Sequence, residues 1–291
     1  MNERCIRLEA GRLSAEISPA AGGALAGFFA GELPLLRPAL LSGPHAGHAL
    51  GMSCFPMVPF ANRIDRGRFN HAGRAVVIAR NVPEPHPLHG HGWQSEWHVA
   101  ARDGNFARLV FRDDTRWPWP YEAFQEFRLG PDSLTVTLGL HSLAAEPFPA
   151  SLGLHPYFPR AGGAWLEARC SRIWERDASG IPTAPQPIPS GQDFGSARRV
   201  SGTSLDHCFE GWRGHAVVRW PAERASLRVE ADDCRFLHVY APDGDDYFCI
   251  EPVTARPDAF NPRQADSSPA PLVQPGGSMS LTMRLYPALE R

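Results

Sequence analysis

Apolar and polar residues alternate along much of the chain, which is the pattern of β-strands with one buried face. The clearest segment lies near the C-terminus, where every second residue from Met279 to Leu285 is apolar. No stretch with helical periodicity is long enough to indicate a major helix. The pattern therefore predicts an all-β protein.

Turn residues join several of these segments into predicted hairpins. Asp103-Gly104 separates the alternating segments 97–102 and 106–112, and Gly130-Pro-Asp132 separates 124–129 from 134–140. Asp and Gly accept the positive φ angles that tight hairpin turns require. Further strands are predicted at residues 13–18, 216–220, 225–230 and 236–240 and, after the turn at 242–244, around Ile250.

Residues 160–205 lack this alternation and are rich in Gly, Pro, Ser and Gln, which predicts a long surface loop. Turn signals occur along the rest of the chain, and no low-complexity linker divides it. These features favour one large antiparallel β-sandwich that spans residues 1–291 as a single domain.

The composition excludes several classes of function. A net charge of -2 without a basic block argues against nucleic-acid or anionic-membrane partners. The 29 basic residues are all Arg, so lysine Schiff-base chemistry is excluded. No phosphate-binding glycine motif follows a strand, and no nucleotide cofactor is implied.

The cysteines and the first residues indicate the compartment. The six cysteines have no metal-binding spacing and are expected to be reduced thiols. Residues 1–12 lack the apolar core of a signal peptide, and no apolar run is long enough to span a membrane. We therefore expect a cytoplasmic protein.

Glu251 ends an apolar, strand-forming run, 247–250, and is followed by Pro252. Partial burial there would raise the pKa of its carboxyl group, as a general base working near neutral pH requires. The alternative is a structural Glu that caps a backbone amide.

Three other polar clusters lie where predicted strands end. Asn62 and Arg63 follow an apolar segment, 54–60, and need partners if they are buried; Arg63 could pair with a core carboxylate or bind a ligand. His155 is followed by a proline, which lacks the amide donor of a ladder, so we expect it at a strand end. It is either a satisfied core histidine or a proton donor.

The third cluster is His89-Gly-His91-Gly-Trp93. Two histidines two residues apart in a strand could bind a metal, as in cupin-type enzymes. The intervening glycines indicate a bend, and no carboxylate completes a ligand set. We expect no metal here, and a neutral His89 that hydrogen-bonds a hydroxylated ligand.

Together these motifs resemble the aldose 1-epimerase (galactose mutarotase) family. The resemblance is carried, in the family's order, by residues 62–64, 88–90, 153–158, 205–206 and 251–261. It implies a β-sandwich of the galactose mutarotase-like type that binds a sugar in an open cleft and interconverts its α and β anomers without a cofactor or metal.

The resemblance also implies roles for individual residues. Glu251 matches the family's general base and His155 its general acid. The residues expected to hold sugar hydroxyls are Arg63, His89 and Asp206, with Asn62 and Tyr157 beside them.

Two features depart from the family pattern. His238 stands where many members have a glutamine, and the chain is shorter than typical galactose-specific members. Both leave the sugar open, and we expect His238 to contact it. The alternatives are an epimerase for phosphorylated hexoses, for which Arg66 and Arg68 could supply cationic groups, a non-catalytic carbohydrate-binding protein, and a cupin-like metal enzyme.

Overall fold

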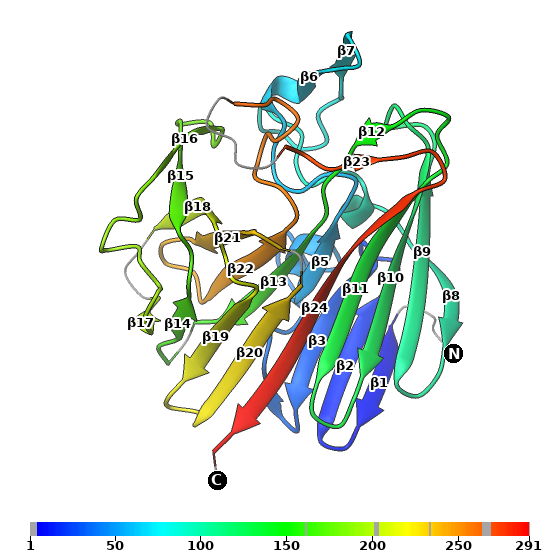
Figure 1. The fold of residues 1–291 in the computed structure, drawn as a ribbon. Coiled ribbons are helices and arrows are strands. Elements are labelled where there is room, and N and C mark those ends of the chain that lie inside the picture. The colour runs from blue at the N-terminus through cyan, green and yellow to red at the C-terminus, as the bar shows by residue number, and fades with distance from the viewer. Residues whose placement is uncertain (1–4, 161, 201–203, 233, 264–268, 291) are drawn as a thin grey trace.

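The computed structural model describes residues 5–160, 162–200, 204–232, 234–263 and 269–290. Two large antiparallel sheets pack against each other, and two small two-stranded sheets lie at one end (Figure 1). Helical structure in the described residues is limited to the short 3-10 turns η1 (Ala49–Gly51), η2 (Asp65–Gly67) and η3 (Gly92–Gln94). The predicted all-β sandwich is confirmed.

The larger sheet has eleven strands among the described residues. In spatial order they are β1 (Ile6–Ala10), β2 (Leu13–Ser18), β3 (Ala24–Ala30) with β4 (Leu33–Pro34) beside it, β5 (Cys54–Met57), β13 (Gly153–Pro159), β22 (Tyr247–Val253), β21 (Phe236–Ala241), β18 (Leu205–Glu210), β15 (Arg172–Arg176) and β16 (Pro182–Gln186).

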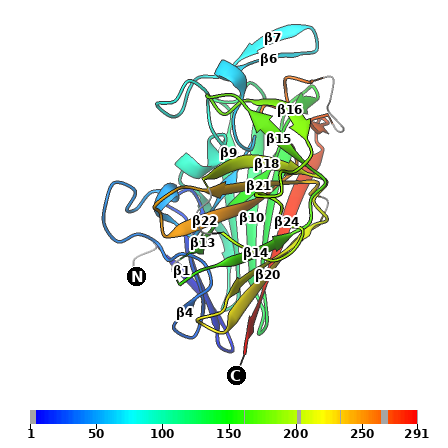
Figure 2. The same cartoon turned by 90° about the vertical axis from the view of Figure 1, so that its left-hand side faces the viewer.

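The smaller sheet has nine strands in the part of the chain that is described. In spatial order they are β17 (Arg198–Arg199), β14 (Trp165–Ala168), β19 (His215–Trp220), β20 (Ala225–Ala231), β24 (Ser278–Leu289), β11 (Leu134–Ser142), β10 (Tyr121–Leu129), β9 (Phe106–Asp113) and β8 (His98–Arg102). Figure 2 shows β22, β21 and β18 crossing in front of β10 and β24 at a steep angle.

The small sheets are the hairpin of β6 (Arg68–His71) and β7 (Arg74–Val77), which projects from the body, and the pair β12 (Phe148–Pro149) and β23 (Leu272–Val273) (Figure 1).

The main core lies between the two large sheets. Alternate residues of the central strands are buried there, such as Leu138 of β11 and Leu281 of β24, which are register partners. Leu237, Val239 and Ile250 fill the core from the larger sheet. The opposite face of these same strands is therefore available for a site.

The structure confirms the predicted hairpins. Strands β8 and β9 flank Asp103-Gly104, β10 and β11 flank 130–133, and the long final strand is β24. The prediction of one long surface loop over 160–205 is wrong, because this region contains β14 to β17. Prolines and short strand lengths hid them: β16 begins at Pro182 and also contains Pro185.

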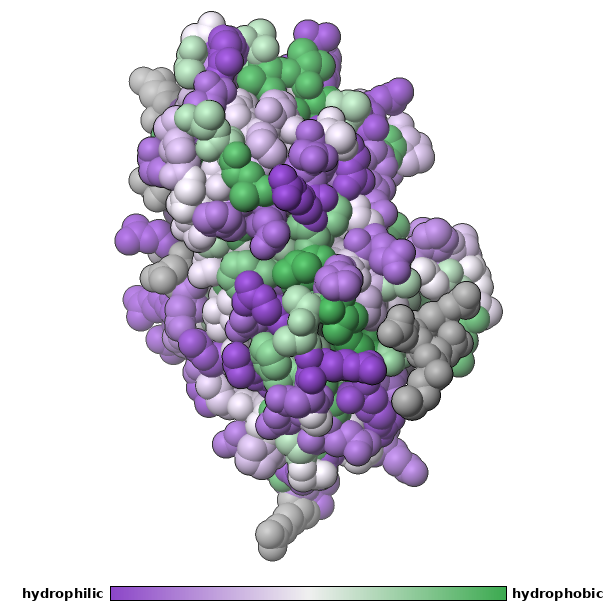
Figure 3. Space-filling model, turned by 90° about the vertical axis from the view of Figure 1, so that its right-hand side faces the viewer, coloured by the Kyte–Doolittle hydropathy of each residue, from purple (hydrophilic) through white to green (hydrophobic). Residues whose placement is uncertain are grey.

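The surface is mixed in character. Figure 3 shows the face on the β8 and β9 side, where hydrophobic residues are scattered among hydrophilic ones. Within the described residues, no helix is both long and apolar enough to cross a membrane.

Candidate active site

A cavity of about 620 Å³ lies on the larger sheet, on the face that points away from the core. Strand register explains why its polar residues gather there. His238 of β21 is the direct partner of Glu251 on β22 and of Cys208 on β18, and directly opposed residues share a face. Asp206 lies two residues before Cys208 and points the same way.

The neighbouring strand β13 brings His155 to the same face. Tyr157 pairs with Cys249, two residues before Glu251, and His155 lies two residues before Tyr157. The expectation that His155 ends a strand is wrong, since β13 continues to Pro159. The ladder between β13 and β22 is nevertheless interrupted from 154 to 156, where Pro156 offers no amide donor.

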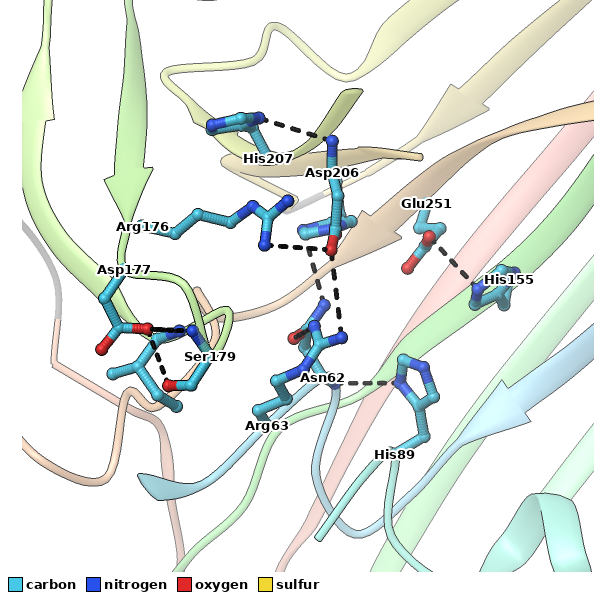
Figure 4. A network of polar contacts seen from close by, with 12 residues as sticks. Asn62, Arg63, His89, His155, Arg176, Asp177, Ser179, Asp206, His207 and Glu251 are labelled. Atoms are coloured by element: carbon cyan, nitrogen blue, oxygen red, sulfur yellow. Dashed lines mark hydrogen bonds and ion pairs between the residues drawn. The ribbon is translucent and has the colours of Figure 1, made fainter. Parts of the chain in front are cut away.

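Glu251 and His155 meet in this interruption. His155 Nε2 lies 3.3 Å from Glu251 Oε1 (Figure 4). Burial raises the pKa of Glu251 to about 7. Burial, together with the nearby His238, lowers the pKa of His155 to about 3. The uncharged forms of both groups are therefore favoured, and between about pH 3 and pH 7 the pair carries one titratable proton.

His89 forms a second side of the cavity from a loop. The backbone N–H of Asn62 donates to His89 Nδ1 at 3.0 Å, so the proton of the neutral ring lies on Nε2. Burial, with the nearby His155 and Arg63, holds the pKa of His89 well below its usual value. His89 thus offers an N–H donor to the cavity, while its contact with a hydroxylated ligand stays a prediction.

Asp206 is the centre of a charged network on the opposite side. His238 Nε2 contacts its Oδ1 at 2.8 Å, and Arg63 Nη2 and Arg176 Nη1 lie 3.9 and 3.6 Å from its Oδ2 (Figure 4). Burial alone raises the pKa of Asp206, but the hydrogen bond from His238 and these arginines hold it well below its usual range. The carboxylate is thus a fixed acceptor.

Asn62 links this network together. Arg63 Nη1 donates to Asn62 Oδ1 at 3.1 Å, and Asn62 Nδ2 lies 3.5 Å from His238 Nδ1. His238 therefore has protein partners on both ring nitrogens. The register confirms that His238 and Glu251 share a face, while contact between His238 and a sugar stays a prediction.

Residues of the region 160–205, which was predicted as a loop, support this side of the cavity from behind. Arg176, at the end of β15, contacts Asp206. In the following turn, Gly180 has a φ of +87°, and a Cβ there would lie 3.1 Å from the Arg63 guanidinium carbon. The hairpin of β15 and β16 is therefore packed directly against a predicted site residue.

Arg37 and Tyr247 complete the cavity beside Tyr157. The Arg37 guanidinium lies 3.9 Å from the ring centroid of Tyr157 and 4.7 Å from that of Tyr247. Exposed acidic residues, Glu84, Asp245 and Asp246, lie at the cavity's outer part.

The remaining candidates lie elsewhere. Arg66 and Arg68 line a separate cavity beside Asp258. His91 Nδ1 lies 3.4 Å from Asp113 Oδ2, away from His89, so the two histidines do not converge. The described residues include no group of three or more His, Cys, Asp or Glu side chains placed to hold a metal ion.

Sequence reasoning missed Arg37, Arg176 and Tyr247. Arg37 stands in an apolar, proline-flanked run, 33–38, so the argument used for Arg63 could have found it. Arg176 lay in the presumed loop, and Tyr247 stood unremarked in the strand that carries Glu251.

The family model for aldose 1-epimerase matches residues 4–286. The chain belongs to the aldose 1-epimerase family. A relative from Escherichia coli K12, uncharacterized protein YphB, is 34% identical over 261 residues, which cover 86% of this chain and 88% of that protein.

Solved structures share the fold of this aldose 1-epimerase family member. A crystal structure from Escherichia coli K12 has a TM-score of 0.91 at 29% identity and covers 98% of this chain and 99% of that one. Galactose 1-epimerase from Lactobacillus acidophilus has a TM-score of 0.80 at 17% identity, covering 99% and 95%. At that identity the likeness supports the fold alone.

Proposed function

We propose that this protein is an aldose 1-epimerase that interconverts the α and β anomers of a free aldose. The observation that carries the proposal is the buried pair of Glu251 and His155, 3.3 Å apart at a cavity of sugar-sized volume. Mutarotation requires one group that removes a proton and one that donates a proton. The pair supplies both.

In the proposed reaction the Glu251 carboxylate takes the proton of the anomeric hydroxyl, and protonated His155 gives its proton to the ring oxygen. The bond between C1 and the ring oxygen breaks, and an open-chain aldehyde results. Rotation about the C1–C2 bond exposes the other carbonyl face. The reverse transfers, from Glu251 to the carbonyl oxygen and from the ring-forming hydroxyl to His155, close the ring as the other anomer.

The number of protons on the pair matters for this cycle. Ring opening leaves a protonated Glu251 and a neutral His155, which is the form that burial favours in the free protein. Moving that one proton from Glu251 to His155 gives the form that opens the ring. The active pair therefore holds one proton throughout, and the cycle needs no proton from solvent.

The other cavity residues suit a hydroxylated substrate. Neutral His89 offers an N–H donor, Asp206 an ionised acceptor, and Arg63 further donors. We propose that these three residues hold the sugar hydroxyls, with Asn62 and Tyr157 beside them, so that C1 and the ring oxygen face the pair.

A free sugar fits the charges better than a phosphorylated one. Arg66 and Arg68, the candidate phosphate ligands, line a different cavity. Glu84, Asp245 and Asp246 at the outer part of the cavity repel a phosphate. Arg37 donates to backbone carbonyls, and Asp206, 3.9 Å from Arg63, offsets the charge of that guanidinium while leaving its N–H groups as donors to neutral hydroxyls.

Polarimetry on freshly dissolved α-anomers of several aldoses tests the proposal. We expect the purified protein to accelerate mutarotation of at least one, and His155→Asn to abolish most of that acceleration. Sugar binding without acceleration would favour a carbohydrate-binding protein. Acceleration restricted to hexose phosphates would favour the phosphorylated substrate. The cytoplasmic location and the single domain stay predictions.

A further inference from the structure

The second ring nitrogen of His155 has no hydrogen bond to any other residue in the described part of the chain. Histidines that transfer protons are usually fixed by a partner on the other ring nitrogen. His155 Nε2 faces Glu251, but the buried Nδ1 makes no hydrogen bond to another described residue. Some other contact must set the plane of the ring.

Aromatic stacking supplies that contact. The ring of Phe55 lies on one side of His155, with centroids 4.4 Å apart and planes 24° apart. The ring of Tyr157 lies 4.8 Å away at 26°. The Phe55 and Tyr157 centroids are 6.1 Å apart, so the two rings contact His155 from different directions. The imidazole cannot turn about χ2 without displacing one of them.

Arg37 extends this stack at its outer end. Its guanidinium lies 3.9 Å from the Tyr157 centroid, within the range of a strong cation–π contact. Its Nη2 donates to the carbonyls of Leu50 and Met52, both at 2.9 Å. Its backbone N–H donates to the Tyr157 carbonyl at 2.9 Å. Arg37 is therefore fixed from several directions and packs against the Tyr157 ring at the edge of the cavity.

We propose that Arg37 is a positioning residue for His155, acting through Tyr157. The contact of Arg37 with Tyr157, and those of Tyr157 and Phe55 with His155, hold the imidazole so that Nε2 faces Glu251. The assignment of His155 as proton donor rests on the proposed function, whereas the effect of Arg37 on the ring does not.

Arg256 provides a matched control. It is also buried, its guanidinium lies 4.9 Å from the ring centroid of Trp174, and it donates to the carbonyls of Pro257 and Asn261 at 2.8 and 3.1 Å. It does not line the cavity, and Trp174 does not stack on His155. Arg256→Met thus removes a similar cation–π contact and similar hydrogen bonds without changing the contacts of His155.

The kinetic test measures kcat and KM for Arg37→Met, Arg37→Lys and Arg256→Met, each at the same interval below its own Tm. We expect Arg37→Met to lower kcat about tenfold and to change KM less than about threefold, since a misplaced proton donor slows the chemical step. Arg37→Lys keeps the cation and should recover part of kcat. Equal losses in Arg37→Met and Arg256→Met would overturn the proposal.

A double-mutant cycle tests the route through Tyr157. In a Tyr157→Leu background, Arg37→Met should have little further effect on kcat, because the link to His155 is already broken. Additive losses would mean that Arg37 acts on the substrate directly, which contradicts the proposal.

Histidine-ring NMR separates this inference from the proposed function. The His155 ring signals, assigned by their loss in His155→Asn, should shift in Arg37→Met and stay in place in Arg256→Met. Unchanged His155 signals in Arg37→Met refute the positioning role. That result is independent of mutarotation, so a protein that fails to accelerate any aldose can still pass or fail this test.

Discussion

The central strands of the two large sheets differ in how regularly they pair; the smaller sheet has a register shift only towards its edge, between β8 and β9, among the described strands. Strands β10 and β11 pair without a break over nine residues each. Strand β24 pairs continuously with β11 on one side and with β20 on the other. The larger sheet has a register shift between β2 and β3, a single paired position between β3 and β5, and the interruption between β13 and β22. Every catalytic and binding candidate lies on or beside this less regular sheet.

The difference has a physical basis. A continuous ladder satisfies the backbone and buries alternate side chains, so it contributes stability but leaves polar groups no room to converge. An interrupted ladder lets two side chains from adjacent strands approach each other. The regular sheet should therefore govern stability, and the irregular sheet should govern chemistry.

The largest effect is expected from removing the carboxylate in the interruption. Glu251→Gln keeps the shape of the side chain and cannot accept the proton, so kcat should fall about a hundredfold or more. Polarimetry gives the rate, and circular dichroism checks that the fold is kept. Mutarotation near the wild-type rate would refute the role of Glu251.

A core substitution in the regular sheet should lower stability and leave kcat nearly unchanged. Leu138 is fully buried on β11, and Leu138→Ala should lower the free energy of unfolding by about 3 kcal/mol. Well below the Tm of this variant, kcat should stay within about twofold of wild type, because the cavity lies on the other sheet. Urea unfolding and polarimetry measure the two quantities. A large fall in kcat would contradict the division between the sheets.

The pH dependence should report the single proton of the pair. Burial raises the pKa of Glu251 to about 7, so above that pH the pair loses its only proton. We expect kcat/KM to be level well below pH 7, to bend near pH 7, and to fall about tenfold per pH unit well above it. An increase of kcat/KM through pH 7 would mean that ionised Glu251 with neutral His155 is the active form.

A smaller effect is expected at the residue that departs from the family pattern. His238→Gln should change the order of kcat/KM among galactose, glucose, fucose and arabinose by a few-fold, and should change stability less. Its partners Asp206 and Asn62 are both affected, so a common loss of rate for all sugars is expected beside the change in order. Strictly parallel losses would remove His238 from the residues that discriminate sugars.

Metal removal should have the smallest effect. The proposed cycle uses only protein groups, and His89 and His91 point to different partners. Activity should be unchanged after prolonged EDTA treatment. A loss that a divalent ion restores would favour the cupin-like alternative.

The same contrast explains what the sequence could predict. Regular alternation identified β24 and the hairpin of β10 and β11 because one face is buried and the other is not. The short, proline-containing strand β16 shows no such alternation. Its position depends on pairing with β15, which the local sequence pattern does not reveal.

The candidate site could likewise be predicted only in part from the sequence. Motifs located Glu251, His155 and Arg63, which the structure brings to one cavity. Motifs did not reveal that His238 is tied to Asp206, or that Arg176 reaches the same carboxylate, because these contacts join strands far apart in the chain. The stack on His155 likewise depends on the lateral order of β5 and β13.

The interruption between β13 and β22 is closed by pairing at both of its ends. The pair of Glu251 and His155 is thus enclosed by the sheet, whereas much of the cavity lining comes from loop residues that touch neither, such as His45, Glu84 and Asp245. Substitutions in those loops can accumulate without disturbing the ladder or the pair. Over evolutionary time, such a frame can acquire new sugar preferences while its chemistry is inherited unchanged.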